Sequence, residues 1–302
     1  MTEAARDAAA AAAGARPGDA RQPLELLVAL LDLERIEEDI FRGVSPPESS
    51  VRVFGGQVAG QALVAAGRTV PAERQVHSLH AYFIRGGDPS VPIVYQVDRV
   101  RDGRSFTTRR VTAVQHGKVI FALSASFQLA EAGLEHAVAM PDVPPPDSLR
   151  SQAEWAAESE LRIERPAIHR PFEVRPVTEP IWSGGAPGEP RERNQVWMRA
   201  DGSLADDPLL HVCVLTYASD LSLLDQVLAW HGKSWATNRV HGASLDHALW
   251  FHRPFRADEW FLYDCTSPNA SGARGLATGY FFAQDGRLLA TVVQEGLLRV
   301  ID

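Results

Sequence analysis

The stretch His77-Ser78-Leu79-His80-Ala81-Tyr82-Phe83-Ile84-Arg85 has a counterpart late in the chain, Ser244-Leu245-Asp246-His247-Ala248-Leu249-Trp250-Phe251-His252. Both are apolar, strand-like runs that carry a histidine at the same place. Aligning His80 with His247 gives an offset of 167 residues (247 − 80). This match is the first sign that the second half of the chain repeats the plan of the first.

Two further pairs of segments support the repeat. Residues 114–119 resemble residues 283–288, and pairing Gly117 with Gly286 gives an offset of 169 (286 − 117). Upstream, residues 53–58 match residues 216–221, and pairing Gln57 with Asp220 gives 163 (220 − 57). Loops accept small insertions more readily than strands or helices do, so a slow drift of the offset is typical of a duplication. The sequence predicts two related domains.

Each half is expected to hold one central helix and an antiparallel run of strands. In the first half, Gly55-Gly56 opens a helical pattern of small apolar residues that suits close packing on a sheet. The segments after it are rich in β-branched and aromatic residues and are separated by turn signals such as Asp102-Gly103 and His116-Gly117. The predicted strands are residues 80–84, 91–100, 105–115 and 118–128.

The second half shows a similar order of patterns. We expect strands near residues 196–199 and 211–217, followed by a helix from residue 221 to about residue 230. Asp220 would then stand where a strand ends and this helix begins. The predicted strands after the helix are residues 244–251, 259–266, 273–283 and 287–299.

The domain boundaries follow from composition. Residues 1–20 are dominated by Ala, Gly, Arg and Asp and predict a disordered tail. Residues 21–130 form the predicted N-terminal domain. Residues 131–165, which include the proline-rich run Met140-Pro141-Asp142-Val143-Pro144-Pro145-Pro146-Asp147, predict a linker. Residues 166–302 form the predicted C-terminal domain, the one expected to carry the chemistry.

Charge and cysteine content narrow the function classes. A formal net charge of −8 and an isoelectric point near 5.7 argue against a nucleic-acid partner. The two cysteines, Cys213 and Cys265, lie in apolar runs and suit a core in a reduced, cytoplasmic protein. No apolar run is long enough to predict a membrane span. No ligand motif predicts a bound metal or cofactor.

A set of segments resembles the acyl-CoA thioesterase II family. The most specific is Asp246-His247-Ala248-Leu249-Trp250-Phe251-His252-Arg253-Pro254-Phe255. Shorter matches are Phe54-Gly55-Gly56-Gln57, Ala218-Ser219-Asp220-Leu221, Ala273-Arg274-Gly275 and Val293-Gln294-Glu295-Gly296. Together they span about residues 24–299. The resemblance implies an α+β double hotdog fold, in which each of two repeats has a central helix wrapped by an antiparallel β-sheet.

The resemblance also implies a reaction, the hydrolysis of fatty acyl-CoA to free fatty acid and CoA. In the family an Asp, a hydroxyl residue and a Gln position a hydrolytic water, and these fall here on Asp220, Ser244 and Gln294. Ser244 stands where the family often has Thr, so the hydroxyl is kept but the methyl that restricts its rotation is not. We expect acyl-CoA as the substrate and a homo-oligomeric assembly.

The residues alone leave plainer interpretations open. Asp220 at a helix start is typical of an N-cap, whose carboxylate accepts bonds from first-turn amides. Ser244 is typical of a strand start, and Gln294 could be a buried amide that is satisfied structurally. In the repeat, however, Ser244 and Gln294 correspond to His77 and Ala125. Only the second copy holds the carboxylate, hydroxyl and amide, which favours one active site per chain.

The oxyanion of a hydrolytic intermediate needs preorganised donors, and backbone amides at a helix start can supply them. Gly55 and Gly56 are our candidates for oxyanion and substrate binding. A serine hydrolase built from Ser244 and His247 is disfavoured, because residues three apart on a strand point to opposite faces. A metal site at His247 and His252 lacks a supporting motif.

Two other function classes remain. A related double hotdog hydratase would be expected to show a Gly-Asp-x-Asn-Pro-x-His motif, which the sequence lacks. The alternative outside catalysis is an acyl-CoA-binding or sensor protein with a vestigial polar set.

Overall fold

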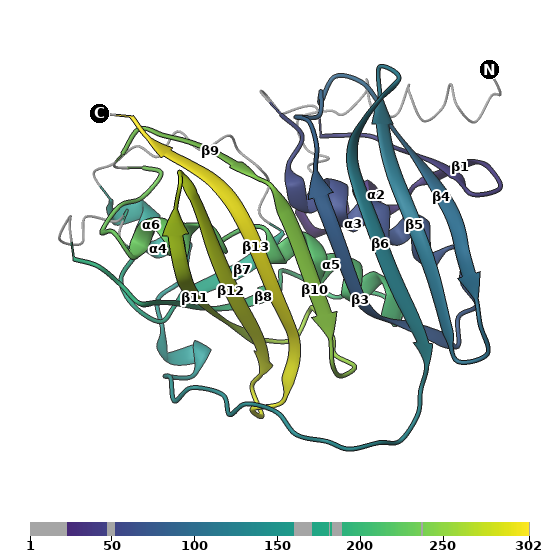
Figure 1. Cartoon of the computed structure of the whole chain (residues 1–302). Coiled ribbons are helices and arrows are strands. Elements are labelled where there is room, and N and C mark those ends of the chain that lie inside the picture. Colours follow the sequence, from purple (N-terminus) through teal and green to yellow (C-terminus); the bar gives the residue numbers. More distant parts are fainter. Residues whose placement is uncertain are drawn as a thin grey trace, which may run out of the picture.

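One large antiparallel sheet forms the frame of the molecule. The computed structural model describes residues 23–46, 52–159, 171–180, 182, 189–236 and 238–301. Within these residues the strand order is β1-β2-β4-β5-β6-β3-β10-β13-β12-β11-β8-β7, with β9 paired to β13 at one side (Figure 1). The predicted tail, residues 1–20, lies outside the described residues.

The described residues of the first half form the helices α2 (Pro23–Leu31) and α3 (Gly55–Gly67). Residues 56–67 of α3 are all buried, and its small side chains allow close approach on every side. This helix confirms the prediction from the Gly55-Gly56 pattern. Its strands are β1 (Glu34–Glu37), β2 (Ile40–Gly43), β3 (Arg74–Phe83), β4 (Ile93–Asp102), β5 (Phe106–Gln115) and β6 (Lys118–Leu129).

The second half contains its own central helix, α5 (Pro208–Ser219), and the shorter helices α4 (Gln152–Glu158) and α6 (Asp225–Ala229). A 3-10 turn, η1 (Pro146–Ser148), precedes α4. The strands are β7 (Phe172–Pro176), β8 (Arg193–Ala200), β9 (Val240–Ser244), β10 (Asp246–Phe251), β11 (Phe261–Ser271), β12 (Arg274–Ala283) and β13 (Leu288–Val300).

The prediction for residues 211–230 is wrong. Residues 211–217 belong to helix α5 and not to a strand, and the expected helix over 221–230 is reduced to α6 and turns. Helix α5 is buried on nearly all sides, so its sequence shows no polar stripe, and its β-branched and aromatic residues imitate a strand. The start signals were present: Asp207 caps Leu209 N–H, and Pro208 occupies the first turn.

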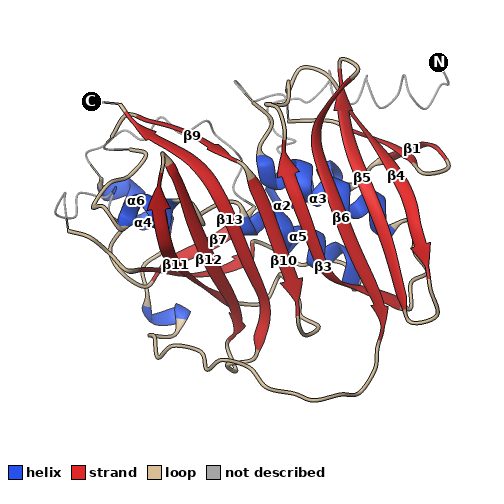
Figure 2. Ribbon diagram, in the orientation of Figure 1, coloured by secondary structure: helices blue, strands red, loops and turns tan. Residues whose placement is uncertain are grey.

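The two halves join edge to edge through β3 and β10. Leu79 pairs with Leu249 and His80 with Ala248 in an antiparallel ladder. The central helices α3 and α5 lie against the same face of this continuous sheet (Figure 2). The main hydrophobic core accordingly contains residues of both halves, including Cys213 and Cys265, which are free and buried as expected. The molecule has the α+β double hotdog fold that the sequence predicted.

The connection between the halves is extended. Residues 130–145 contain no helix or strand, and they link the end of β6 to η1 (Figure 1). In the part of the chain that the structure describes, no helix is long and apolar enough to cross a membrane.

Candidate active site

The candidate site lies where the start of helix α3 meets the end of helix α5. Helices α3 and α5 pack against one another in opposite directions. The first turn of α3 meets the end of α5, since Gly56 N–H donates to Asp220 Oδ2 over 2.8 Å. At the other end of the pair, a Cβ on Gly67 would lie 2.5 Å from Leu209. The site is therefore built from both halves of the chain.

Asp220 follows helix α5 and does not begin a helix. It is the C-cap residue of α5, with φ −89° and ψ −1°, so the predicted N-cap position is wrong. The carboxylate reaches instead the N-terminus of α3, 164 residues earlier. The positive end of that helix favours negative charge. The expected carboxylate–helix contact exists, but the helix belongs to the other half.

Three donors converge on the Asp220 carboxylate. Oδ2 accepts from Gly56 N–H, and Oδ1 accepts from Gln294 Nε2 at 2.7 Å and from Ser244 Oγ at 3.4 Å. Ser244 ends β9 and pairs with Gly296 on β13, while Gln294 lies on β13 and is completely buried. The structure thus brings together the three polar residues that the sequence singled out.

Burial dominates the electrostatics of this carboxylate. It raises the pKa of Asp220 to about 6, although the hydrogen bonds from Gln294, Gly56 and Ser244 act in the opposite direction. At neutral pH the group is mainly ionised yet more basic than an exposed aspartate. A carboxylate with these properties can both orient a water and accept its proton.

Glycine is required where the helices touch. A Cβ on Gly55 would lie 2.6 Å from Asp220 Oδ2, and one on Gly56 would lie 2.5 Å from the Tyr217 carbonyl oxygen. The structure directs Gly56 N–H at Asp220, and not at open space where a substrate oxygen would bind. The Gly56 amide is therefore engaged by the carboxylate, which leaves Gly55 as the oxyanion candidate of the pair.

Sequence reasoning missed two polar residues beside this set. His247, which was considered only for a disfavoured serine-hydrolase or metal site, is 1% exposed, and its Nε2 lies 2.8 Å from Ser219 Oγ. Ser219 is the last residue of α5, and its carbonyl accepts from Tyr263. The available signal was the histidine of the Asp246-His247 motif, which sits in an apolar strand beside Gln294. His252 lies outside this set, because it is exposed and its Nε2 contacts Thr291 Oγ1 at 2.9 Å.

Two family models match most of this chain. Residues 165–297 match the family model described as acyl-CoA thioesterase, and residues 45–128 match the model of the acyl-CoA thioesterase N-terminal domain. Acyl-coenzyme A thioesterase 8 of Homo sapiens is 44% identical over 95% of this chain and 92% of its own length. The chain belongs to the acyl-CoA thioesterase family.

Other members of the family are equally similar over nearly the whole chain. Acyl-CoA thioesterase 2 of Haemophilus influenzae is 40% identical over 91% of this chain and 98% of its own length. The crystal structure of the acyl-CoA thioesterase II TesB2 from Mycobacterium marinum is 46% identical, with a TM-score of 0.76 over 92% of this chain and 98% of that one.

Helices α3 and α5 also meet at their other ends, where the end of α3 contacts the start of α5. Arg68 is the C-cap of α3, as Asp220 is of α5, so the earlier pairing of Gln57 with Asp220 is wrong. Arg68 donates to the Leu33 carbonyl and pairs with Asp32. The carboxylate of the candidate site has no equivalent at this junction.

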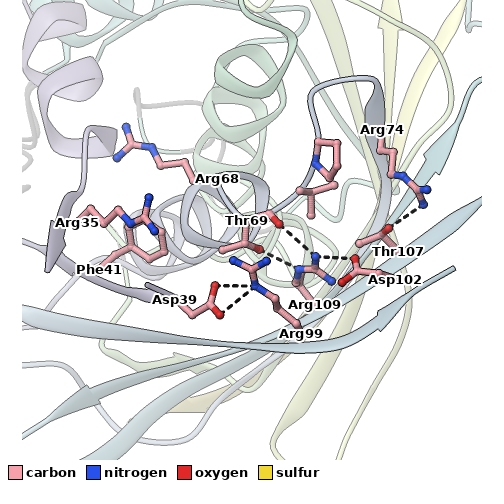
Figure 3. A pocket seen from close by; sticks show the side chains of 12 residues that line it. Arg35, Asp39, Phe41, Arg68, Thr69, Arg74, Arg99, Asp102, Thr107 and Arg109 are labelled. Atoms are coloured by element: carbon pink, nitrogen blue, oxygen red, sulfur yellow. Dashed lines mark hydrogen bonds and ion pairs between the residues drawn. The ribbon is translucent and has the colours of Figure 1, made fainter. Parts of the chain in front are cut away.

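A cavity of about 410 Å³ adjoins this second junction and is lined by five arginines (Figure 3). The most buried of these arginines is Arg109, whose side chain is 1% exposed. It donates to Thr69 and forms an ion pair with Asp102 at 2.7 Å. Arg99 is paired with Asp39. These pairings make the cavity wall a structural network and not a copy of the carboxylate site. In the described residues, no cluster of His, Cys, Asp and Glu could hold a metal ion.

Proposed function

We propose that this protein hydrolyses fatty acyl-CoA to free fatty acid and CoA, using a water activated by Asp220 and positioned by Ser244 and Gln294. The observation that carries the proposal is the partly buried Asp220 carboxylate, on which an amide, a hydroxyl and a helix N-terminus converge. Its membership of the acyl-CoA thioesterase family supplies the substrate class.

In the proposed reaction, a water held by the polar set gives a proton to Asp220 while its oxygen attacks the thioester carbonyl carbon. The carbonyl π electrons move to oxygen and form a tetrahedral oxyanion. When this intermediate collapses, the carbon–sulfur bond breaks and the thiolate of CoA leaves. The proton held by Asp220 is then transferred to the thiolate, so the carboxylate is restored and no covalent enzyme intermediate forms.

The remaining groups have distinct proposed roles. Gln294 and Ser244 donate to Asp220 Oδ1, which fixes the carboxylate plane and leaves their remaining polar capacity for the water. Gly56 N–H anchors Oδ2. The first turn of α3, beginning at Gly55, offers further backbone amides to the oxyanion, and such donors are often worth about 3 kcal/mol each.

The proposal is tested by measuring release of free thiol from acyl-CoA thioesters of graded chain length. The wild type should turn over at least one of them, and Asp220→Asn should lower the rate by about 10²–10⁴-fold while keeping the fold. Exposed Asp201→Asn is the matched control and should retain the wild-type rate. An acyl-CoA sensor would bind the thioesters and leave them intact, which would refute the proposal.

The proposal extends to location and assembly. Two free buried cysteines fit a reducing compartment such as the cytoplasm. The end strands β1 and β7 leave one side of their ladders without a partner strand in the described sheet, which suits association into a homo-oligomer.

A further inference from the structure

His247 has a buried imidazole ring, of which one nitrogen makes a polar contact and the other makes none among the described residues. Its Nε2 lies 2.8 Å from Ser219 Oγ at the end of α5. Its Nδ1 is buried and has no hydrogen-bond partner at ordinary distance among the described residues. A buried ring nitrogen left in this way requires an explanation, because interior polar groups are nearly always paired.

The side-chain oxygen of Gln294, Oε1, is a second buried polar atom without a hydrogen-bond partner among the described residues. The Nε2 atom of the same side chain donates to Asp220. Strands β10 and β13 pair Ala248 with Val293, so one further step along the antiparallel ladder sets His247 opposite Gln294. Directly opposed residues project from the same face with Cβ atoms roughly 5 Å apart. The two orphan atoms are thus neighbours of complementary type.

We propose that His247 is a positioning residue that carries its proton on Nδ1 and donates to Gln294 Oε1, so that the amide NH₂ of Gln294 faces Asp220. This inference rests on the proposed function, in which that amide holds the catalytic carboxylate. It extends the site from three residues to a chain of donors running from Ser219 through His247 and Gln294 to Asp220.

The alternative arrangements are unfavourable for stated reasons. With the proton on Nε2, the Nδ1 lone pair would face the lone pairs of Gln294 Oε1. A rotated Gln294 amide would set its oxygen against the ionised carboxylate. Ser219 Oγ donates to the Thr216 carbonyl over 2.8 Å and lies 2.8 Å from His247 Nε2, so the proposed arrangement requires its single hydrogen to turn from that carbonyl to Nε2.

The ring is neutral in this arrangement. Burial lowers the pKa of His247 to about 4, and the neighbouring Gln294 side chain is the one opposing influence. The groups that face Asp220 are likewise without positive charge: burial raises the pKa values of Tyr217 and Tyr263, which therefore stay neutral, and Asp225 adds negative charge. Loss of the Gln294 donation should thus raise the pKa of Asp220 further.

Two amide substitutions separate a positioning role from a packing role. In His247→Asn the side-chain NH₂ takes the place of Nδ1. The rate of thioester hydrolysis should therefore stay within about threefold of wild type, and the acidic pKa of the pH–rate profile within about 0.3 pH units. In His247→Gln the amide takes the place of Nε2, so the rate should fall at least about tenfold and the acidic pKa should rise. Exposed His136→Gln is the control and should behave as wild type.

A packing role would reverse this order, because Gln is closer to His in volume than Asn is. A better rate for His247→Gln than for His247→Asn would therefore overturn the proposal. In a Gln294→Leu background the two His247 variants should lose their difference, since the group that they position is gone. A difference that persists there would also contradict the proposal.

The tautomer can be read without substrate, which separates this inference from the proposed function. Nitrogen-15 spectra of histidine-labelled protein, with the His247 signals identified by their absence in His247→Asn, should show a protonated Nδ1 and a bare Nε2 at pH 7. A protonated Nε2 would overturn the positioning role even in an active hydrolase. A wild type with the expected tautomer but no hydrolysis would instead refute the proposed function.

Discussion

The amide nitrogen of Gly56 lies 2.8 Å from the Oδ2 atom of Asp220, although 164 residues separate them. One atom belongs to the central helix of the first half and the other to the residue that ends the central helix of the second. The positive end of α3 thereby stabilises a carboxylate that its own helix, α5, presents at its negative end. The duplicated fold supplies the two opposite helix ends that this arrangement needs.

The first prediction concerns the pH dependence of hydrolysis. Because the proposed base is ionised Asp220, whose pKa burial raises to about 6, kcat/KM should increase with pH through a midpoint near 6 and level off above pH 7. The profile would be measured with an acyl-CoA thioester from pH 4.5 to 8.5. A flat profile across pH 5 to 7 would rule out titration of this carboxylate as the limiting event.

The second prediction concerns stability. Folding raises the pKa of Asp220, so the folded chain binds this proton more tightly than the unfolded chain does. The resulting stabilisation is present below about pH 4 and is lost as pH rises through 6. Between pH 4.5 and 7.5 the wild type should lose roughly 2 kcal/mol relative to Asp220→Asn. Urea unfolding of both proteins at the two pH values measures the difference, and parallel pH responses would contradict it.

The third prediction tests the hydroxyl beside the carboxylate. Ser244→Ala removes a weak donor to Asp220, 3.4 Å away, and should reduce kcat about three- to tenfold. Ser244→Thr keeps the hydroxyl and restricts its rotation, so its rate should equal or exceed that of wild type. Steady-state kinetics of the pair decide the matter: if alanine performs as well as threonine, the hydroxyl has no part in the reaction.

The fourth prediction concerns the contact between the helices. A methyl group at Gly55 would lie 2.6 Å from Asp220 Oδ2 and 3.0 Å from the Phe83 ring, so Gly55→Ala must displace the carboxylate or the helix. Hydrolysis should fall at least about tenfold, since misplacement of a catalytic group by 1 Å can reduce the rate about 10²-fold. Gly133→Ala, where no atom lies within 4 Å of the new methyl, is the control. Equal activity of both variants would remove the steric argument.

The fifth prediction concerns the core of the first half. The buried hydroxyl of Tyr95 donates to Gln61 Oε1 at 2.7 Å, and Gln61 in turn donates to the Leu30 carbonyl. Tyr95→Phe leaves Gln61 Oε1 without this donor and should lower the free energy of unfolding by about 1–3 kcal/mol. The same substitution at Tyr82, which is 65% exposed, should change it by less than about 0.5 kcal/mol. Chemical denaturation of both variants provides the measurement.

Much of the fold was predictable because its strands alternate clearly and its turns contain glycine. Strands β4, β5 and β6 fall within two residues of the sequence-based ranges. Helix α5 was missed because it is buried on nearly all sides and so lacks the polar face that identifies most helices. The periodicity of apolar residues shows which faces of a segment are buried. When all faces are buried, it cannot distinguish a helix from a strand.

The candidate site was predictable in its members but not in its geometry. Asp220, Ser244 and Gln294 were identified from family motifs and from their absence in the first repeat. The contact of Asp220 with α3 was not, because a pairing between helix ends 164 residues apart leaves no local pattern. His247 could not be identified for a similar reason: its contact Ser219 lies on α5 and its neighbour Gln294 on the paired strand β13, both remote from it in the sequence.

The extended connector of residues 130–145 carries no helix or strand, while the β3–β10 seam and the α3–α5 contact bring the two halves together. A chain cut within this connector would yield two fragments, one with the amide of Gly56 and the other with Asp220, Ser244 and Gln294. Neither fragment alone would cleave thioesters, and mixing them would restore turnover in proportion to their association. The scaffold is accordingly suited to a split-enzyme reporter, in which catalysis signals that two attached proteins have met.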